Sequence, residues 1–233
     1  MKRNTFHTVF FHIAARDVMA ETAYFSSLGF EPLNSPMDGL TVISDGALRL
    51  SIGPENGIST GILLAGEKME DMKLAVAQSG YQPSDGMFPM LSGPSGTHVT
   101  LIELPAFSCQ AIGGKPIGLL GTFFEISVET KNHEATVEYW EKLGFEIIYG
   151  ERDGNWVTLA DDFMKIGFYR KDTVGHPFRS PAITYFEKDM KDRINLIKTL
   201  DIPVSYEVEA CGDSASDAIL ETPSGNHIFA FTA

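Results

Sequence analysis

The feature that most constrains this chain is an internal duplication. The segment AYFSSLGFE at 23–31 recurs as EYWEKLGFE at 138–146, an offset of 115 residues. Further along each half, GPSGTH at 93–98 resembles TPSGNH at 222–227. Self-similarity in the same order along both halves is the sequence mark of a repeated architecture. The 233 residues are therefore expected to form two copies of one structural unit.

Each half divides again into two shorter units. A short apolar run at 9–14 predicts a strand, and the spacing of apolar residues along 18–25 predicts a helix after it. Three short strand-like segments follow, bounded by turn residues. The cycle begins again near Ile62, Thr122 and Ala182. The pattern predicts an α+β chain made of four βαβββ modules.

Glycine and proline mark a boundary between the halves. The run Gly113-Gly114-Lys115-Pro116 has the composition of a linker. We therefore predict a first domain at 1–109, a linker at 110–117 and a second domain at 118–233. We expect modules one and two to pair, and three and four to pair; pairing of one with four and two with three is the alternative.

A strand, a helix closed by an aromatic pair and Leu-Gly-Phe, and three further strands resemble the module of the vicinal oxygen chelate superfamily. This is the glyoxalase, bleomycin resistance protein and extradiol dioxygenase group. The PSGTH and PSGNH segments at 94–98 and 223–227 resemble that family's turn into the last strand of a module. The resemblance covers nearly the whole chain and implies two paired-module domains, each with a curved sheet around a cleft.

Charge and cysteine content narrow the partners. The formal net charge is −13, whereas nucleic-acid binding and docking on an anionic membrane both call for a basic surface. No apolar run reaches the length of a membrane span. Cys109 and Cys211 are the only cysteines, too few for a disulfide framework or a cysteine-based zinc cluster. We expect a cytoplasmic monomer or homodimer whose partner is a small molecule.

The resemblance also implies where a divalent metal would be held, because family enzymes carry His and Glu ligands on the first and last strands of paired modules. Matching those positions by their spacing from the helix aromatics and the turn glycines gives six residues: Phe10, Gly61, Thr100, Glu125, Ala182 and Phe229. Phenylalanine, glycine and alanine side chains cannot ligate such a cation. The sequence therefore predicts no metal or other cofactor at the usual position in either half.

Strand alternation indicates what lines the clefts instead, since every second side chain shares a face. The ligand-binding residues predicted in this way are Phe10, His12, Arg49, His98 and Thr100 in the first half, and Phe123, Lys165, His227, Phe229 and Phe231 in the second. They describe aromatic cavities with a few polar groups, as small-molecule sites have. His176, in a predicted loop, is expected at the surface.

Glu125 is the candidate catalytic residue, because it interrupts an apolar strand and a buried carboxylate needs a partner such as Lys165 or His227. A carboxylate held by structural hydrogen bonds is the alternative. His12, His98, Glu125 and His227 are also the alternative ligands of a non-standard metal site for one Zn, Ni, Fe or Mn ion.

Two functions remain open. The first is a protein that binds a small aromatic or anionic molecule in an apolar cleft without a metal. The second is a metal-dependent enzyme, a glyoxalase-type lyase or isomerase or an extradiol dioxygenase, with a non-standard metal site. The usual metal ligands are absent at the matched positions, which favours the binding protein over the enzyme. Whether the protein has any enzymatic activity is left undecided.

Overall fold

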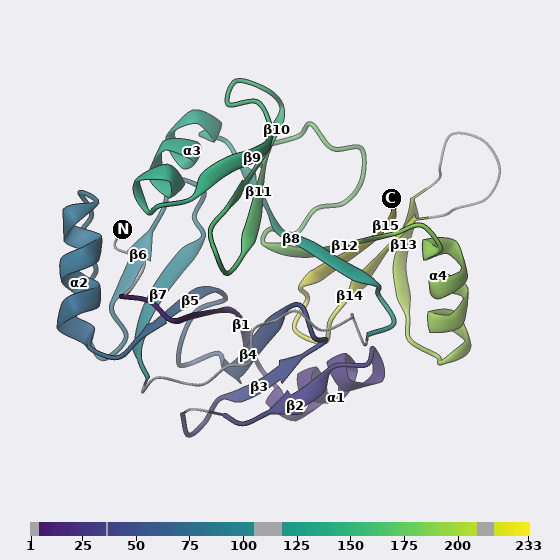
Figure 1. Cartoon of the computed structure of the whole chain (residues 1–233). Coiled ribbons are helices and arrows are strands. Elements are labelled where there is room, and N and C mark those ends of the chain that lie inside the picture. The colour runs from purple at the N-terminus through teal and green to yellow at the C-terminus, as the bar shows by residue number, and fades with distance from the viewer. Residues whose placement is uncertain (1–4, 36, 105–117, 209–216) are drawn as a thin grey trace.

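The computed structural model describes residues 5–35, 37–104, 118–208 and 217–233. The predicted linker at 110–117 and both cysteines, Cys109 and Cys211, lie outside these residues. The described chain forms two sheets and the helices that pack against them, as the duplication predicts (Figure 1).

The first half forms a seven-stranded sheet in the order β2-β3-β4-β1-β5-β7-β6. Its elements are β1 (Thr8–Ala15), α1 (Val18–Ser27), β2 (Glu31–Leu33), β3 (Thr41–Ser44), β4 (Arg49–Pro54), β5 (Gly61–Gly66), α2 (Met69–Gln78), β6 (Met90–Ser92) and β7 (His98–Glu103).

The second half forms an eight-stranded sheet in the order β13-β14-β15-β12-β8-β11-β10-β9. Its elements are β8 (Thr122–Thr130), α3 (His133–Lys142), β9 (Glu146–Gly150), β10 (Trp156–Ala160), β11 (Lys165–Arg170), β12 (Ala182–Glu187), α4 (Met190–Thr199), β13 (Val204–Val208), β14 (Asp217–Glu221) and β15 (His227–Thr232).

Strand pairing decides which modules combine. β1 pairs antiparallel with β5, and β8 pairs antiparallel with β12, so module one joins module two and module three joins module four within one sheet. The second module departs from the expected pattern, because a single short strand, β6, lies between α2 and β7. Pro83, Gly86 and Pro89 fall in this segment, and proline removes the backbone donor that a ladder requires.

The main hydrophobic core lies between the sheets and their helices. Phe11 and Ile13 of β1 pack in the same cluster as Phe25 of α1, and Ile126 of β8 packs with Trp140 of α3. This cluster is continuous across both halves. The four predicted modules thus share one core on the helix side of the sheets. Among the described residues, no helix has the length and hydrophobicity that crossing a bilayer requires.

The two duplicated motifs meet across the halves. Glu21 of α1 accepts a hydrogen bond from the backbone N–H of Ser224, in the turn before β15, at 2.8 Å. Tyr139 of α3 lies so close to Gly93, in the turn before β7, that a Cβ at that glycine would come within 2.9 Å of the ring. Each duplicated helix therefore contacts the duplicated turn of the other half.

Candidate functional site

Both sheets have a face opposite their helices, which we call the helix-free face. On the first sheet this face is filled by a separate hydrophobic cluster that contains Phe10, Leu63 and Ile102. Met37 and Phe88, from the loops, pack against this cluster. Phe10 and the neighbouring candidates thus share one face, as strand alternation predicts, but the face is a packed interior.

His12 is the most buried of these candidates, with no exposed surface. Its Nδ1 lies 2.8 Å from Ser51 Oγ, and its Nε2 lies 3.1 Å from the carbonyl oxygen of Ile58. Because a carbonyl only accepts, Nε2 carries the proton and Nδ1 accepts from the serine hydroxyl. Burial lowers the pKa of His12 to about 4. The ring is a neutral structural group with both nitrogens occupied.

The remaining first-half candidates lie around the same packed face. Arg49 is almost buried and donates a hydrogen bond to Thr8 Oγ1 at 2.9 Å. Thr100 is buried on β7, and His98 is half-buried with its Nδ1 3.5 Å from Ser92 Oγ. The prediction that these residues share a face holds, and their contacts are with other parts of the fold.

On the second sheet, the helix-free face holds a buried carboxyl group inside a set of hydroxyl groups. Glu125 has no exposed surface and accepts hydrogen bonds from Thr158 Oγ1 at 2.7 Å, Tyr169 OH at 2.7 Å and Ser127 Oγ at 3.0 Å. Ser127 in turn lies 2.6 Å from Thr184 Oγ1. Burial is the largest influence on the carboxyl and raises its pKa, and the hydrogen bond from Tyr169 opposes that rise most.

The carboxyl group fits only because the neighbouring strand carries a glycine. A Cβ on Gly167 of β11 would lie 1.9 Å from Glu125 Oε1. Gly167 and Ser127 are paired in register, and Tyr169 is two residues further along β11 on the same face. The arrangement therefore depends on three residues together: Gly167 leaves the space, Glu125 fills it, and Tyr169 donates a hydrogen bond to the carboxyl.

A row of aromatic rings crosses the same face. Phe124 stacks on Tyr149 with ring centroids 5.9 Å apart, and it meets Phe186 edge-on at 5.1 Å. Phe186 is 6.0 Å from Phe231 of β15. Tyr149 is 49% exposed, and the other three rings are half-buried, so the row is accessible from outside.

The aromatic row corrects the prediction for Phe123. The ladder between β8 and β12 shifts register between Thr184 and Tyr185, which leaves Phe124 as an extra residue in β8. Such a bulge interrupts the alternation of faces. Phe123 consequently packs with Tyr185 and the main core, and Phe124 takes the place on the helix-free face.

Lys165 is the basic group of this face. Its Nζ lies 5.3 Å from the centroid of the Phe124 ring and 6.0 Å from that of Tyr149. Cation–π contacts of this kind hold an ammonium group over aromatic faces. Its positive charge also acts on the pKa of Glu125, in the direction that lowers it. The predicted position of Lys165 on the helix-free face agrees with these contacts.

The segment between β11 and β12 covers one end of the row. His227 Nδ1 accepts a hydrogen bond from the backbone N–H of Arg179 at 3.2 Å, which holds the segment against β15. Phe229 is buried beneath Phe178 and His176, with centroids 5.0 and 4.9 Å away. His176, which is expected at the surface, is partly exposed, and its ring also packs on two phenylalanines of β15.

The residues do not fit a divalent metal. His12 uses both ring nitrogens within the fold, and Glu125 receives three hydroxyl donors. The alternative ligands are also divided, with His12 and His98 on one sheet and Glu125 and His227 on the other. Across the described ranges, no group of three or more His, Cys, Asp or Glu side chains is arranged to hold a metal ion.

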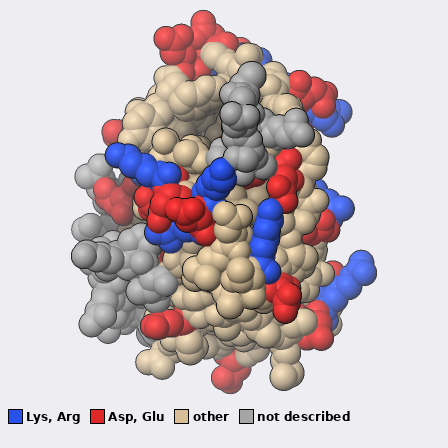
Figure 2. All heavy atoms as spheres, turned by 90° about the vertical axis from the view of Figure 1, so that its right-hand side faces the viewer, with Lys and Arg blue, Asp and Glu red and all other residues tan. Residues whose placement is uncertain are grey.

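Several residues of this site were not predicted from the sequence. Strand alternation could have predicted Tyr169 and Thr158, since it places them on the same face as Lys165 and Glu125. Phe124 was hidden by the bulge, and Tyr149 by a register shift between β9 and β10. On the face that Figure 2 shows, the Lys and Arg side chains of the described residues lie among Asp and Glu side chains.

Comparison with known proteins shows the fold. Three solved structures cover nearly all of this chain: a catechol 2,3-dioxygenase (13% identity, 97% of this chain and 87% of that chain, TM-score 0.59), the 2,3-dioxygenase LapB from Pseudomonas sp. KL28 (12%, 99% and 93%, 0.57) and a variant of 4-hydroxymandelate synthase from Streptomyces coelicolor (13%, 98% and 91%, 0.58). No protein-family model and no curated protein matches the chain.

At this identity the likeness concerns the fold. The chain has the vicinal oxygen chelate fold, with four modules in two paired sheets, which the sequence resemblance predicted. The activities in the names of these structures belong to those proteins, because one fold hosts many chemistries.

Proposed function

We propose that this protein binds a small aromatic anion on the helix-free face of the eight-stranded sheet, without a metal at the family's usual position. The observation that carries the proposal is the accessible row of Tyr149, Phe124, Phe186 and Phe231 beside Lys165. The corresponding face of the seven-stranded sheet is filled by its own side chains. The proposal therefore assigns binding to the second half of the chain.

The aromatic row supplies the apolar part of recognition. Aromatic rings prefer offset-stacked or edge-on contacts and gain about 0.5–1.5 kcal/mol per pair beyond the burial of their area. Phe124 already makes one contact of each kind, with Tyr149 and Phe186. A planar ligand laid against this row buries apolar surface that is now partly exposed, which favours binding.

Lys165 supplies the charge selectivity. An ammonium group on a flexible stem can turn from the rings to an anionic substituent and form charge-assisted hydrogen bonds, which are roughly twice as strong as neutral ones. The Glu125 carboxyl has no exposed surface and accepts hydrogen bonds from Tyr169, Thr158 and Ser127, so it makes no direct contact with an anion on the row.

Proton transfer is the second candidate function, with Glu125 as the proton-holding group. Burial raises the pKa of its carboxyl, and the half-buried Tyr169 donates its hydroxyl to that carboxyl and so links it to the face. A raised carboxyl pKa brings the group closer to the range in which an acid or base works at neutral pH. In this role Glu125 acts through Tyr169.

Titration calorimetry with matched ligands tests the binding proposal. Benzoate, cyclohexanecarboxylate and benzyl alcohol separate the contributions of ring and charge. We expect benzoate to bind best, and Lys165→Met and Phe186→Leu each to weaken it roughly tenfold. Lys131→Met, an exposed lysine beside α3, is the matched control. If both face variants bind benzoate like the wild type, the proposal is wrong.

Elemental analysis separates the metal-free protein from the alternative. Protein prepared without chelator is expected to contain no stoichiometric Zn, Ni, Fe or Mn. Stoichiometric metal that disappears in Glu125→Gln would overturn the metal-free part of the proposal. We also propose, from the low cysteine content, that the protein acts in the cytoplasm, and, from the internal duplication, that it is a monomer or a homodimer.

A further inference from the structure

We propose that His176 determines which ligand fits the aromatic row, as a second polar anchor at the end away from Lys165. The ligand class that this implies is a flat aromatic carboxylate with two rings in line and a hydroxyl group at the end opposite the carboxylate. The inference rests on the proposed function, because it takes the row and Lys165 as the binding site and adds the length and the far end of the ligand.

The ring of His176 continues the row beyond its last phenylalanine. It meets Phe231 edge-on with centroids 5.2 Å apart, and Phe229 edge-on at 4.9 Å. The residue is half-buried, so part of the ring is accessible to a ligand. The segment that carries it is held against β15 by the hydrogen bond from Arg179 to His227, which fixes the position of the ring.

The imidazole of His176 offers a hydrogen-bond acceptor at this end. Its Nδ1 lies 3.1 Å from the carbonyl oxygen of Pro177. Because a carbonyl only accepts, Nδ1 carries the proton of the neutral ring, and the lone pair is on Nε2. Within the described ranges, no group forms a hydrogen bond with Nε2. A ligand hydroxyl that reaches this end of the row can therefore donate to it.

The two ends of the row differ in the group that they bind. Lys165 is a positively charged donor beside Phe124 and Tyr149, whereas His176 accepts. A carboxylate forms charge-assisted hydrogen bonds with the ammonium group, and a hydroxyl donates to the imidazole. In the reverse orientation the carboxylate would face an acceptor lone pair. The ligand is therefore bound in one direction, with its anionic end at Lys165.

The strand order gives the length of the ligand. Lys165 is on β11 and Phe231 is on β15, with β8 and β12 between them. Adjacent strands lie about 4.8 Å apart, so the two ends are separated by about 14 Å along the sheet. Phe186 and Phe231 are paired in register, so the row runs across the strands. A single ring covers only part of this distance, and two rings in line cover most of it.

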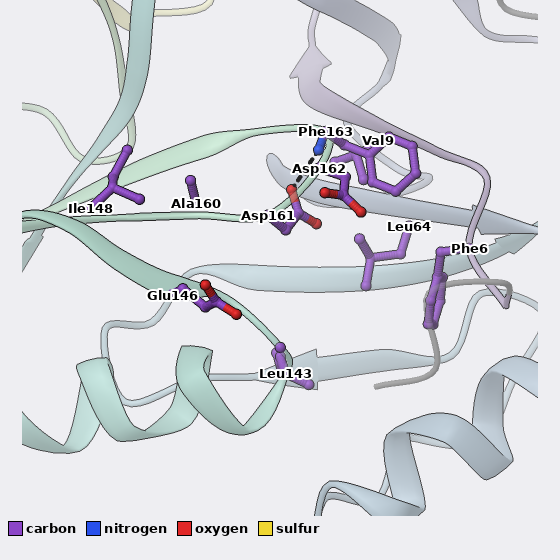
Figure 3. A pocket seen from close by; sticks show the side chains of 11 residues that line it. Phe6, Val9, Leu64, Leu143, Glu146, Ile148, Ala160, Asp161, Asp162 and Phe163 are labelled. Atoms are coloured by element: carbon purple, nitrogen blue, oxygen red, sulfur yellow. Dashed lines mark hydrogen bonds between the residues drawn. The ribbon is translucent and has the colours of Figure 1, made fainter.

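The cavity between the two halves does not suit this ligand. It has a volume of about 220 Å³ and is lined by Phe6 and Phe163 beside the carboxyl groups of Glu146 and Asp161 (Figure 3). Pockets for drug-sized ligands have ~300–1,000 Å³. A carboxylate would also be repelled by the carboxyl groups there. Phe163, which is 41% exposed, is therefore a suitable control position for aromatic binding at the wrong place.

Calorimetry of the intact chain tests the inference with benzoate, 4-hydroxybenzoate, biphenyl-4-carboxylate and 4′-hydroxybiphenyl-4-carboxylate. We expect the last to bind roughly tenfold or more tightly than benzoate, because its second ring covers more of the row. It should also bind about fivefold more tightly than biphenyl-4-carboxylate, because of its hydroxyl. The hydroxyl of 4-hydroxybenzoate does not reach His176 and should add nothing.

His176→Phe keeps a ring and removes the acceptor. It is expected to abolish the gain from the distal hydroxyl and to leave benzoate binding unchanged, which also shows that the variant is folded. Phe163→Leu is the matched control and should leave all four affinities unchanged. The inference is overturned if the distal hydroxyl adds nothing in the wild type, if its gain survives in His176→Phe, or if Phe163→Leu weakens binding of the long ligand.

The same measurements separate this inference from the proposed function. If benzoate binding depends on Lys165 while the distal hydroxyl adds nothing, His176 is not an anchor and the binding site on the row stands. If benzoate binding does not depend on Lys165, the proposed function and this inference are both wrong.

Discussion

The helix-free faces of the two sheets follow the same plan and have different contents. In the first half, loop residues such as Met37 and Phe88 close over an apolar cluster. In the second half, Phe124, Phe186 and Phe231 stay partly exposed above a buried carboxyl group. Duplication allows such a division, because each copy can keep the fold while the side chains on its helix-free face differ.

The two helix-free faces differ at a few equivalent strand positions. Strand pairing makes Phe10 the counterpart of Glu125 and Ser51 the counterpart of Gly167. The first half places a ring and a hydroxyl where the second half places a carboxyl group and an empty Cβ position. These pairs show that a buried charge needs both hydrogen-bond donors and space, and that the second half supplies both.

Gly167→Ala is expected to have the largest effect, because it breaks the arrangement specific to the second half. The new methyl group would lie 1.9 Å from Glu125 Oε1 and must displace a carboxyl group that holds three hydrogen bonds. We expect a loss of about 3–5 kcal/mol in the free energy of unfolding, measured by chemical denaturation.

The control for this prediction is Gly175→Ala, at a glycine where an added methyl group would meet no atom within 4 Å and where φ is not left-handed. It should change stability by less than about 0.5 kcal/mol. Ser51 shows that the equivalent strand position tolerates a Cβ, so the conflict is with Glu125. If Gly167→Ala costs as much in a Glu125→Ala background as in the wild type, this explanation is wrong.

The buried His12 of the first half should make the free energy of unfolding depend on pH. The pKa of His12 falls from 6.5 to about 4 in the folded protein because the ring is buried. A lowered folded pKa means that stability is fully present above pH 6.5 and is lost as the pH falls toward 4. The expected contribution is on the order of 3 kcal/mol between these limits.

His12→Gln isolates that contribution, since the variant lacks the titrating group. The difference in stability between wild type and variant should shrink as the pH falls from 6.5 to 4. The comparison with variants is needed because Glu125, Asp45 and Asp161, whose pKa values are raised, act with the opposite sign. A pH-independent difference would refute the neutral buried state of His12.

Arg49→Met tests whether the basic residue of the first half is structural. Arg49 is 9% exposed, and its guanidinium donates to Thr8 Oγ1, which is buried. Loss of a buried hydrogen bond from a charged donor should cost about 1.5–3 kcal/mol, measured by chemical denaturation. Benzoate binding should not change. Weaker benzoate binding with unaltered stability would instead place a ligand site in the first half.

The sequence predicted the fold well because the repeats and the hydrophobic pattern record local structure. The four modules and their helices follow from the spacing of apolar residues and the duplicated helix ends. The second module lost a strand where Pro83 and Pro89 interrupt the segment, which the prediction by analogy with the other modules overlooked. Pairing of modules stayed open, because strand order depends on contacts that are distant in sequence.

The candidate site was predicted less completely, for two physical reasons. A bulge in β8 exchanged the faces of Phe123 and Phe124, and strand alternation carries no sign of such an insertion. Closure of the first face by Met37 and Phe88 also depends on loop packing, which periodicity does not report. Glu125 was singled out because a carboxylate interrupts an apolar strand, and Lys165 because strand alternation places it on the cleft side at the position that matches Arg49.

Lys165→Met is expected to change stability least, and its effect should be much smaller than that of Arg49→Met. Lys165 is half-buried, and its contacts at 5.3 and 6.0 Å with two rings are cation–π contacts near the surface, worth about 0.5–1 kcal/mol. Methionine keeps the apolar stem over the same rings, so the free energy of unfolding should fall by no more than about 0.5 kcal/mol. If Lys165→Met lowered the free energy of unfolding as much as Arg49→Met, both basic residues would be structural. The two helix-free faces would then have the same structural role despite their different side chains.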